Sequence, residues 1–317
     1  MADAADDDAK PLDPADPAFD AFFAAMDEPG GDGPPDGDYE DLDAKGRPRA
    51  RYTIRDGKLD GPAEFYRDGA VTQRCAFRAG LLHGPCQVYE EGVLLQEAHF
   101  VDGVIDGEAV NYVDGAPASR FTYRDGRPHG AADFYEAGAL TQHSTFDQGY
   151  LEGETVFYDA QGEVAQRLPY RDGLKEGKGV LYDQGRRLVE IDFVEDRMTG
   201  WLVTYGPTDK PMARIPYRDG LKEGEARYFD LDGRLVKTES YAADKLDGPT
   251  REYLPGGPCL KESPYAAGKL DGWVVEYSPK GKETFRQEFK GGEPVGPKLE
   301  KTRFGRREAG DGEAEED

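Results

Sequence analysis

Apolar and polar positions alternate along most of this chain in runs of five to ten residues, and short glycine-containing turns separate the runs. In one such stretch a run from Gly61 ends at the aromatic Tyr66, an Asp-Gly turn follows, and a second run ends at Phe77. Runs of this length are too short for stable helices, and two of them around an Asp-Gly turn are typical of a β-hairpin. We therefore expect short paired strands whose side chains alternate between two faces.

The hairpin phrase recurs along the chain with a nearly constant period. Its most regular member is a glycine, which falls at Gly61, Gly84, Gly107, Gly130, Gly153, Gly177, Gly200, Gly224, Gly248, Gly272 and Gly296, in steps of 23 or 24 residues. A fixed period of this length indicates repeats that bury apolar surface only by stacking on their neighbours. The sequence predicts an all-β fold, an elongated single-layer antiparallel β-meander of about ten hairpin repeats over residues 51–296.

Two aromatic positions recur in every repeat. The first ladder is Tyr66, Tyr89, Tyr112, Tyr135, Tyr158, Tyr182, Tyr205, Phe229, Tyr253 and Tyr277, and the second is Phe77, Phe100, Tyr123, Phe146, Tyr170, Phe193, Tyr217, Tyr241, Tyr265 and Phe289. We expect these rings to stabilise the sheet by burial and by contact between neighbouring rings. A platform that stacks a substrate is the less favoured alternative.

A polar residue precedes the periodic glycine in nine repeats: Asp60, His83, Asp106, His129, Glu152, Glu176, Glu223, Asp247 and Asp271. A side chain that bonds the backbone of a turn explains all nine positions. Calcium binding is the alternative, but it requires several converging oxygens, and each repeat offers one carboxylate. We expect no metal site and no cofactor.

Catalytic motifs are absent from the sequence. It has no GxGxxG or phosphate-binding loop, no GxSxG, no HExxH and no paired CxxC motif. We therefore expect that the chain is not an enzyme. A catalytic site of another kind would require a cleft with perturbed carboxylates.

The three cysteines leave two alternatives open. Cys75 and Cys86 flank one inter-repeat turn, so their strands are expected to pair and a disulfide is geometrically conceivable. An odd number of cysteines without a secretion signal is typical of a reducing compartment. The prediction is two free thiols.

The charge of the chain is strongly negative, at −24. Residues 1–50 hold 15 acidic and 4 basic residues, a net charge of −11. This balance argues against binding to nucleic acid or to an anionic membrane and favours a basic protein partner. No run approaches the apolar length that a membrane span needs, and no leader is visible, so we expect a cytoplasmic protein without membrane insertion.

The two ends of the chain differ from the repeats. We expect residues 1–50 to be an acidic, mostly disordered arm with one short amphipathic helix at 17–26, which places Phe19, Phe22, Phe23 and Met26 on one side. This helix either caps the first hairpin or docks in a groove of a partner. Residues 297–317 are expected to be a charged disordered tail.

The repeated phrase resembles a known family. Tyr123 to Gly130 leading to Tyr135, and Tyr170 to Gly177 leading to Tyr182, follow the pattern YxDGxxxGxxxxY. The pattern is similar to the MORN-repeat class, in particular to the bacterial YwqK-type antitoxins. The resemblance covers about 245 of the 317 residues. It implies a partner protein, typically a toxin, that is held inactive in the producing cell.

Two residues and one turn depart from the phrase. Asp196 and Asp244 stand where the first glycine of the phrase is expected, and one hairpin turn, 206–211, has an altered sequence. These departures are either tolerated left-handed aspartates or marks of a bend or contact surface.

The sequence thus predicts a non-enzymatic protein-binding repeat protein, an antitoxin or immunity protein that neutralises a partner by occlusion. The predicted contact residues are Phe19, Phe22, Phe23, Met26, Trp201 and Trp273. Both tryptophans follow the periodic glycine, where other repeats carry Glu, Pro, Ala or Lys, and packing is the alternative role for them. The alternative function is an architectural scaffold that assembles end to end, with homodimers through the ends of the array.

Overall fold

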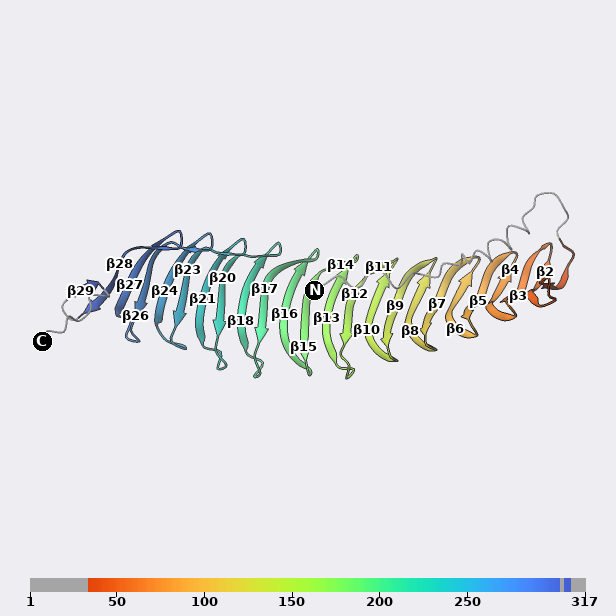
Figure 1. Cartoon of the computed structure of the whole chain (residues 1–317), viewed down its shortest axis with the longest axis horizontal. Helices are drawn as coiled ribbons and strands as arrows, with labels where there is room; N and C mark the ends of the chain where they lie inside the picture. The colour runs from red at the N-terminus through yellow and green to blue at the C-terminus, as the bar shows by residue number, and fades with distance from the viewer. Residues whose placement is uncertain (1–33, 303–304, 309–317) are drawn as a thin grey trace. The chain divides into compact units, whose positions relative to one another are not determined.

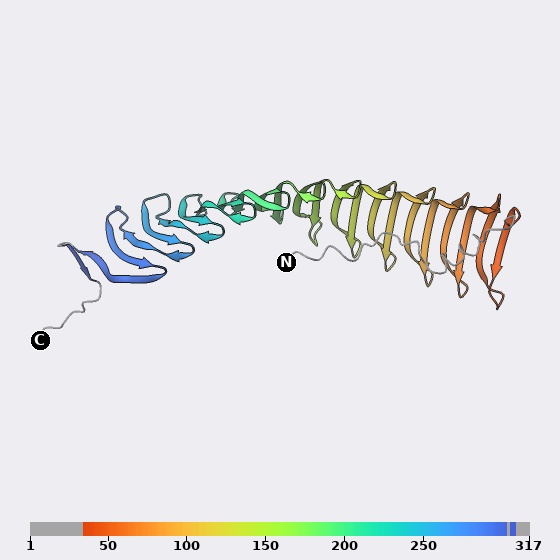
Figure 2. The same ribbon diagram turned by 90° about the horizontal axis from the view of Figure 1, so that it is seen from above.

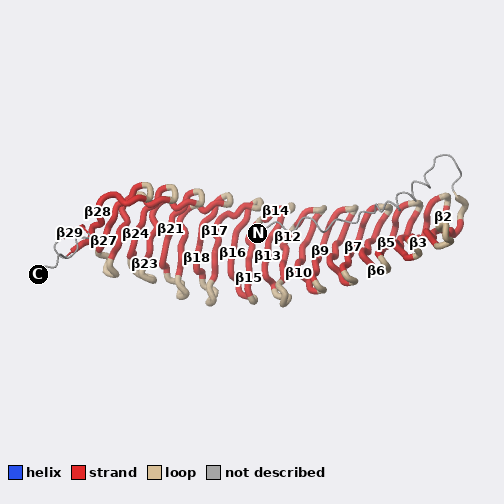
Figure 3. Tube along the Cα trace, in the orientation of Figure 1, coloured by secondary structure: helices blue, strands red, loops and turns tan. Residues whose placement is uncertain are grey.

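The fold comes from a computed structural model that describes residues 34–302 and 305–308. The regular structure in these residues consists of strands, joined by turns (Figure 1 and Figure 3). None of them forms a helix long and apolar enough to cross a membrane. The chain divides into two compact units, Met1–Tyr150 (unit 1) and Leu151–Asp317 (unit 2).

Unit 1 is a meander of long strands. In chain order they are β1 (Gly37–Leu42), β2 (Pro48–Arg55), β3 (Lys58–Arg67), β4 (Ala70–Arg78), β5 (Leu81–Glu90), β6 (Val93–Val101), β7 (Val104–Val113), β8 (Ala116–Arg124), β9 (Arg127–Glu136) and β10 (Ala139–Asp147). The short β11 (Tyr150–Leu151) follows in the chain. Each strand from β1 to β10 pairs antiparallel with the next, which confirms the predicted meander.

Unit 2 repeats the same hairpin, but several strands are interrupted just before the periodic glycine. Its strands are β12 (Gly153–Tyr158), β13 (Val164–Arg171), β14 (Leu174–Lys175), β15 (Gly177–Asp183), β16 (Arg186–Val194), β17 (Arg197–Tyr205), β18 (Pro211–Arg218), β19 (Leu221–Lys222), β20 (Gly224–Phe229), β21 (Leu235–Ala242), β22 (Lys245–Leu246), β23 (Gly248–Tyr253), β24 (Cys259–Ala266), β25 (Lys269–Leu270), β26 (Gly272–Tyr277), β27 (Glu283–Lys290), β28 (Glu293–Thr302) and β29 (Gly305–Glu308). Their pairings are antiparallel, as in unit 1.

The backbone explains both glycines of the phrase. The turn between β2 and β3 has φ of 49° at Asp56 and 72° at Gly57, the pair of left-handed residues that tight hairpins require. The periodic glycine lies in a strand at an irregularity of the register. At Gly84 φ is 102°, a region that L-residues with a side chain rarely adopt.

Asp196 and Asp244 take the left-handed conformation, each with φ of 65°. Their carboxylates accept hydrogen bonds from the backbone N–H groups of Lys175 and Lys222, both at 2.8 Å. The tolerated-aspartate alternative is therefore confirmed at both positions, and each side chain also ties its turn to the preceding one.

The register assigns side chains to two faces. In unit 1 one face, here called the apolar face, has a central row of Tyr39, Tyr52, Ala63, Cys75, Cys86, Ala98 and Ala109, each opposite the next. Ile54, Leu59, Phe77 and Phe100 are buried beside this row and complete one apolar cluster. The other face, here called the charged face, has Glu40, Arg51, Glu64 and Arg74 opposite one another along its central row.

The two aromatic ladders lie on opposite faces. Phe77 belongs to the apolar cluster, whereas the ring of Tyr66 lies on the charged face, where its hydroxyl donates a hydrogen bond to Glu64. Arg51 lies over the ring of Tyr66, with Cζ 5.6 Å from the ring centroid. The first ladder is thus held by cation–π and hydroxyl contacts at the surface.

Ring contacts in unit 1 join the second ladder to aromatic residues outside it. Phe77 contacts Phe65 with ring centroids 6.5 Å apart. Phe121 contacts the ladder rings of Tyr123 at 6.1 Å and of Phe146, two strands further along, at 6.0 Å. Phe65 and Phe121 belong to neither ladder, so direct contact between rings of one ladder stays a prediction.

The prediction of free thiols at Cys75 and Cys86 is wrong. The two residues are directly opposite on β4 and β5 and form a disulfide. Both sit in the central row of the apolar face, where the pleat holds their Cβ atoms close together. Cys259 has a free thiol.

Strand pairing extends beyond the predicted repeat boundaries of 51–296. At the beginning β1 pairs with β2, and at the end β29 pairs with β28. Seen from above, the strands of each unit follow one another in a single layer (Figure 2). Each unit therefore offers two sheet faces, and those of unit 2 position Trp201 and Trp273.

Candidate protein-binding face

Unit 2 also has a charged face, of a different composition. Its central row, read across the paired strands, is Val156, Arg167, Val180, Glu190, Val203, Arg214, Arg227, Thr238, Arg251, Glu262, Val275 and Arg286. Arginine and valine dominate the row, although the whole chain is acidic. The acidic excess of the chain therefore does not concentrate on this face.

Trp201 lies on β17 beside this row, directly opposite Pro216 of β18. The periodic Gly200 precedes it and has φ of 62°. Trp201 is 44% exposed, so packing covers only part of the residue. Tryptophan is enriched at the energetic centres of protein interfaces.

Trp273 occupies the same position on β26 and is 39% exposed. Its strand partner is Glu288, and the guanidinium of Arg286 lies over its ring at 5.3 Å from the centroid. Trp201 and Trp273 are each two residues before a member of the same central row, Val203 and Val275, so both rings are on the same face. Six strand spacings separate β17 from β26, about 29 Å.

Arg214 stands between the two tryptophans. It is exposed and lies opposite Arg227 of β20. Arg227 pairs with Glu225 at 2.9 Å, and Arg251 pairs with Glu262 at 2.7 Å. Within residues 34–302 and 305–308 no carboxylate forms an ion pair with Arg214. This guanidinium is available to a partner.

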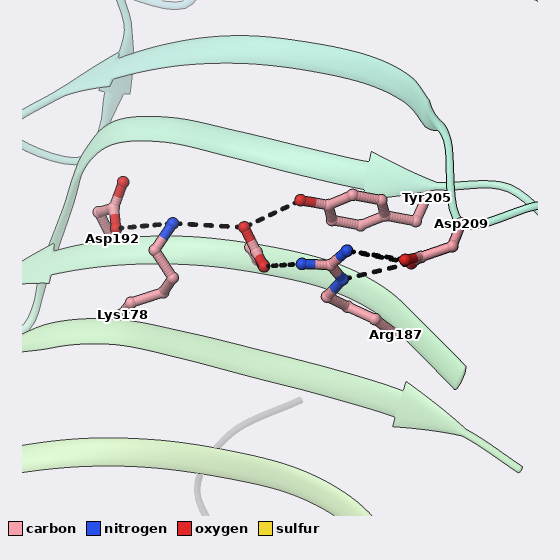
Figure 4. Close-up of polar contacts among 6 residues, drawn as sticks. Lys178, Arg187, Asp192, Tyr205 and Asp209 are labelled. Atoms are coloured by element: carbon pink, nitrogen blue, oxygen red, sulfur yellow. Dashed lines mark hydrogen bonds and ion pairs between the residues drawn. The ribbon is translucent and has the colours of Figure 1, made fainter. Parts of the chain in front are cut away.

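A polar network lies on the same face, around Glu190 of β16 (Figure 4). The carboxylate of Glu190 accepts hydrogen bonds from Arg187 Nη1 at 2.6 Å, from the Tyr205 hydroxyl at 2.9 Å and from Lys178 Nζ at 3.3 Å. Burial alone would raise the pKa of Glu190, but these three donors outweigh it and lower the pKa. Glu190 is thus an ionised, well-satisfied group that holds three side chains in place.

The altered turn 206–211 belongs to this network. Its Asp209 accepts two hydrogen bonds from Arg187 Nη2, at 3.1 and 3.0 Å, and Arg187 also stacks on the ring of Tyr205 at 4.1 Å. The turn is closed by its own backbone, with Gly206 N donating to Lys210 O at 2.9 Å. The turn is thereby connected to the preceding hairpin, and Asp209 takes the left-handed conformation, with φ of 55°, as the tolerated-aspartate alternative expects.

A buried carboxylate, Glu239, lies on the opposite face and is not among the residues that the sequence singled out. It accepts hydrogen bonds from the hydroxyls of Tyr228 and Tyr241 at 2.6 and 2.7 Å and pairs with Lys237 at 2.6 Å. The signal was available, because the equivalent position in earlier repeats is Cys75 or Ala98. Burial opposes ionisation, yet the hydrogen bonds from Lys237 and the two tyrosines prevail and lower the pKa of Glu239.

The polar residues before the periodic glycine act as predicted. Eight of the nine bond the turn backbone one repeat further on, as Asp60 accepts from Ala79 N at 3.1 Å; the others are His83, Asp106, Glu152, Glu176, Glu223, Asp247 and Asp271. His129 instead pairs with Asp147 at 3.0 Å. In the described part of the chain, no three His, Cys, Asp or Glu side chains are grouped so that they could hold a metal ion. The predicted contact residues Phe19, Phe22, Phe23 and Met26 lie outside the described residues.

Comparisons with known proteins add little to this geometry. No protein-family model matches the chain, and no curated protein matches it. Among solved structures, a crystal structure of TarM matches 28% of this chain and 18% of its own chain, with 14% identity and a TM-score of 0.22. A mutant of S. aureus TarM in complex with fondaparinux, alpha-GlcNAc-glycerol and UDP matches 32% of this chain and 19% of its own chain, with 13% identity and a TM-score of 0.24. Likeness at this level carries no argument about fold or activity.

Proposed function

We propose that this chain is a non-enzymatic protein-binding repeat protein whose charged face between Trp201 and Trp273 holds a partner protein and neutralises it by occlusion. The observation that carries the proposal is the pair of exposed tryptophans on one face of one unit. Tryptophan and arginine are the residues most enriched at the energetic centres of protein interfaces. Here both kinds of residue lie on a rigid sheet.

The dimensions of this face support the proposal. The patch is about 29 Å across the strands and about 20 Å along them, on the order of 600 Å² in projection. One partner of a standard interface contributes about 800 Å². The polar network around Glu190 pre-orders one border of the patch, which lowers the entropic penalty of binding.

The antitoxin or immunity role is proposed from the resemblance of the repeats to the YwqK-type class. The net charge of −24 favours a basic toxin or effector, because complementary charge accelerates encounter. The first 50 residues, with a net charge of −11, supply much of that attraction. The rigid patch on the charged face supplies specificity.

The test is affinity purification of the tagged full-length protein from its native cells, compared with a Trp201→Ala/Trp273→Ala variant. The matched control is Leu231→Ala/Leu254→Ala, which removes exposed apolar side chains from turns of the same unit. We expect at least a ten-fold loss of a stoichiometric partner with the tryptophan variant and no loss with the control. The antitoxin role further requires that the partner alone stops growth and that co-expression of this chain restores growth. Equal recovery by both variants would place binding elsewhere.

One observation favours a second candidate function, an architectural scaffold. β1 pairs with β2 on one side, and no strand within the described residues pairs with its other side. The exposed strand is acidic, with Asp38, Glu40 and Asp41, whereas β29 at the other end of the chain contains Arg306 and Arg307. Unlike ends favour head-to-tail pairing over a symmetric dimer through β1. Sedimentation from 1 to 100 μM, at low and high salt, would reveal growing, salt-sensitive assemblies if this function were the correct one.

A further inference from the structure

The charged face of unit 2 is locally basic between its two tryptophans. From Val203 to Val275 the central row contains three arginines and one carboxylate: Arg214, Arg227, Arg251 and Glu262. The whole chain, by contrast, has 64 acidic and 40 basic residues. The contact surface therefore selects a different chemistry from the one that the net charge of the chain attracts over a distance.

The three guanidiniums of this row are accessible to a partner. Arg214 is exposed and forms no ion pair with the described part of the chain. Arg227 and Arg251 pair with Glu225 and Glu262 at the surface, where an ion pair contributes little to stability, so a partner's carboxylate can replace either glutamate. Arginine binds a carboxylate through two parallel hydrogen bonds and is therefore suited to that group.

A buried hydroxyl lies in the same row. Thr238 is 3% exposed and lies opposite Arg227 on one side and Arg251 on the other. Its Oγ1 forms no hydrogen bond with any described residue. An unpaired buried hydroxyl costs free energy. The Thr238 hydroxyl and the Arg214 guanidinium can both donate, so an acceptor oxygen from a partner would satisfy this row.

A second row, here called the tryptophan row, runs beside the arginines on the same face. Its members are two residues along each strand from the central row, about 7 Å away. The apolar members are Trp201, Pro216, Pro249, Pro264 and Trp273. Glu225 and Ser240 complete the row, and Arg227 neutralises Glu225 at 2.9 Å. The tryptophan row therefore suits the apolar side chains of a partner.

A peptide fits these two rows better than a nucleic acid does. Glu225 and Glu262 lie within the rows, and the net charge of −24 repels a continuous run of phosphates. A peptide can instead place single carboxylates over the arginines and apolar side chains over the tryptophans. About 19 residues of helix would span the distance of about 29 Å between the tryptophans.

We propose that the partner held by this face presents an acidic segment, whose carboxylates bind Arg214, Arg227 and Arg251 and whose apolar side chains pack on the tryptophan row. The proposal rests on the proposed function, because it names the chemistry of the contact at the same patch. A partner that is basic as a whole can still bind through such a segment. The arginines then provide specificity for carboxylates, and the tryptophans provide apolar anchors.

Intrinsic fluorescence tests the contact, because the chain has two tryptophans and both lie in the patch. The full-length protein is titrated with a peptide of about 20 residues, made of glutamate and of leucine at helical spacing. Control peptides carry glutamine or lysine in place of glutamate. We expect a saturable change of tryptophan emission with the glutamate peptide, about ten-fold tighter than with the glutamine peptide and weaker at high salt.

Arg214 is the position for the matched variants. Arg214→Glu should weaken binding of the glutamate peptide about ten-fold or more, and Arg214→Lys, which keeps the charge without the paired donors, should weaken it less. The control is Arg171→Glu, because Arg171 is also exposed, forms no ion pair with the described residues and lies four strands before Arg214. Circular dichroism should be the same for all three variants.

Three results would overturn the proposal: equal binding of the glutamine peptide, a larger response to the lysine peptide or to oligothymidylate, or an equal effect of Arg171→Glu. A silent titration would also reject the acidic contact, and the proposed function would stand if Trp201→Ala/Trp273→Ala still lost the partner in the affinity purification. If the glutamate peptide binds as expected but that tryptophan variant retains the partner, the proposed function is the part that fails.

Discussion

At the scale of single residues, Gly84 in a strand and Ala137 in a turn both have positive φ, so substitutions at the two positions should have opposite effects on stability. At Gly84 φ is 102°, and an added Cβ would approach the Cβ of Ala76 at 3.3 Å. We expect Gly84→Ala to lower the free energy of unfolding by about 1–2 kcal/mol. Ala137 has φ of 47°, so Ala137→Gly relieves left-handed strain and should leave stability unchanged or raise it by up to about 1 kcal/mol. Urea unfolding measures both, and equal destabilisation by the two substitutions would refute the backbone explanation.

Glu239 makes stability depend on pH. Its pKa lies below the ordinary value of 4.5, so its contribution is present above that value and is lost as pH falls through the pKa of the folded state. We expect Glu239→Gln to lower the free energy of unfolding by about 1–3 kcal/mol at pH 7. The difference from the parent protein should shrink at pH 3.5.

The control for Glu239 is Glu225→Gln, because the Glu225–Arg227 pair is exposed and should contribute about 0–1 kcal/mol. Urea titrations at both pH values give the comparison. A penalty for Glu239→Gln that stays the same at pH 3.5 would show that the carboxylate charge is not the cause.

At the scale of elements, successive hairpins are joined by a side chain as well as by the sheet. Asp247 accepts a hydrogen bond from the backbone N–H of Ala267, in the next inter-repeat turn, at 3.1 Å. We expect Asp247→Ala to lower the free energy of unfolding by about 1 kcal/mol and Asp247→Asn, which retains an oxygen acceptor, to lower it less. Hydrogen exchange at Ala267 provides a local measurement. Unchanged protection of this amide in Asp247→Ala would exclude the proposed link.

At the scale of the whole molecule, the repeats of unit 1 should be removable one period at a time. Deletion of residues 108–130 joins Gly107 to Ala131, and Ala131 takes the place of Glu108 because Gly107 and Gly130 lie at equivalent positions of β7 and β9. The faces and the strand direction are kept, so we expect a folded protein with a somewhat lower melting temperature. Deletion of residues 108–119 breaks the hairpin order and should prevent normal folding. Circular dichroism melts distinguish the two, and similar melting of both deletions would contradict a repeat-based fold.

The sequence by itself determined the repeat, the strand alternation and the tight turns. Each of these depends on local chemistry, such as glycine at positive φ or a polar side chain beside a turn, which a single strand or hairpin already contains. For the same reason Trp201 and Trp273 could be chosen as predicted contact residues from their place after the periodic glycine. The hydrogen bond from a turn backbone to the side chain of Asp60 was also predictable, since a polar residue recurs at this position in nine repeats.

Only the tertiary structure decided which strands place their side chains on one face and which residues meet across strands. The disulfide between Cys75 and Cys86 depends on the register of two strands, and the donors around Glu190 come from three different strands. The contact between the rings of Phe121 and Phe146, which are two strands apart, likewise depends on how the strands are paired. Such relations are absent from any local pattern, because the pleat and register that create them exist only once the strands are paired.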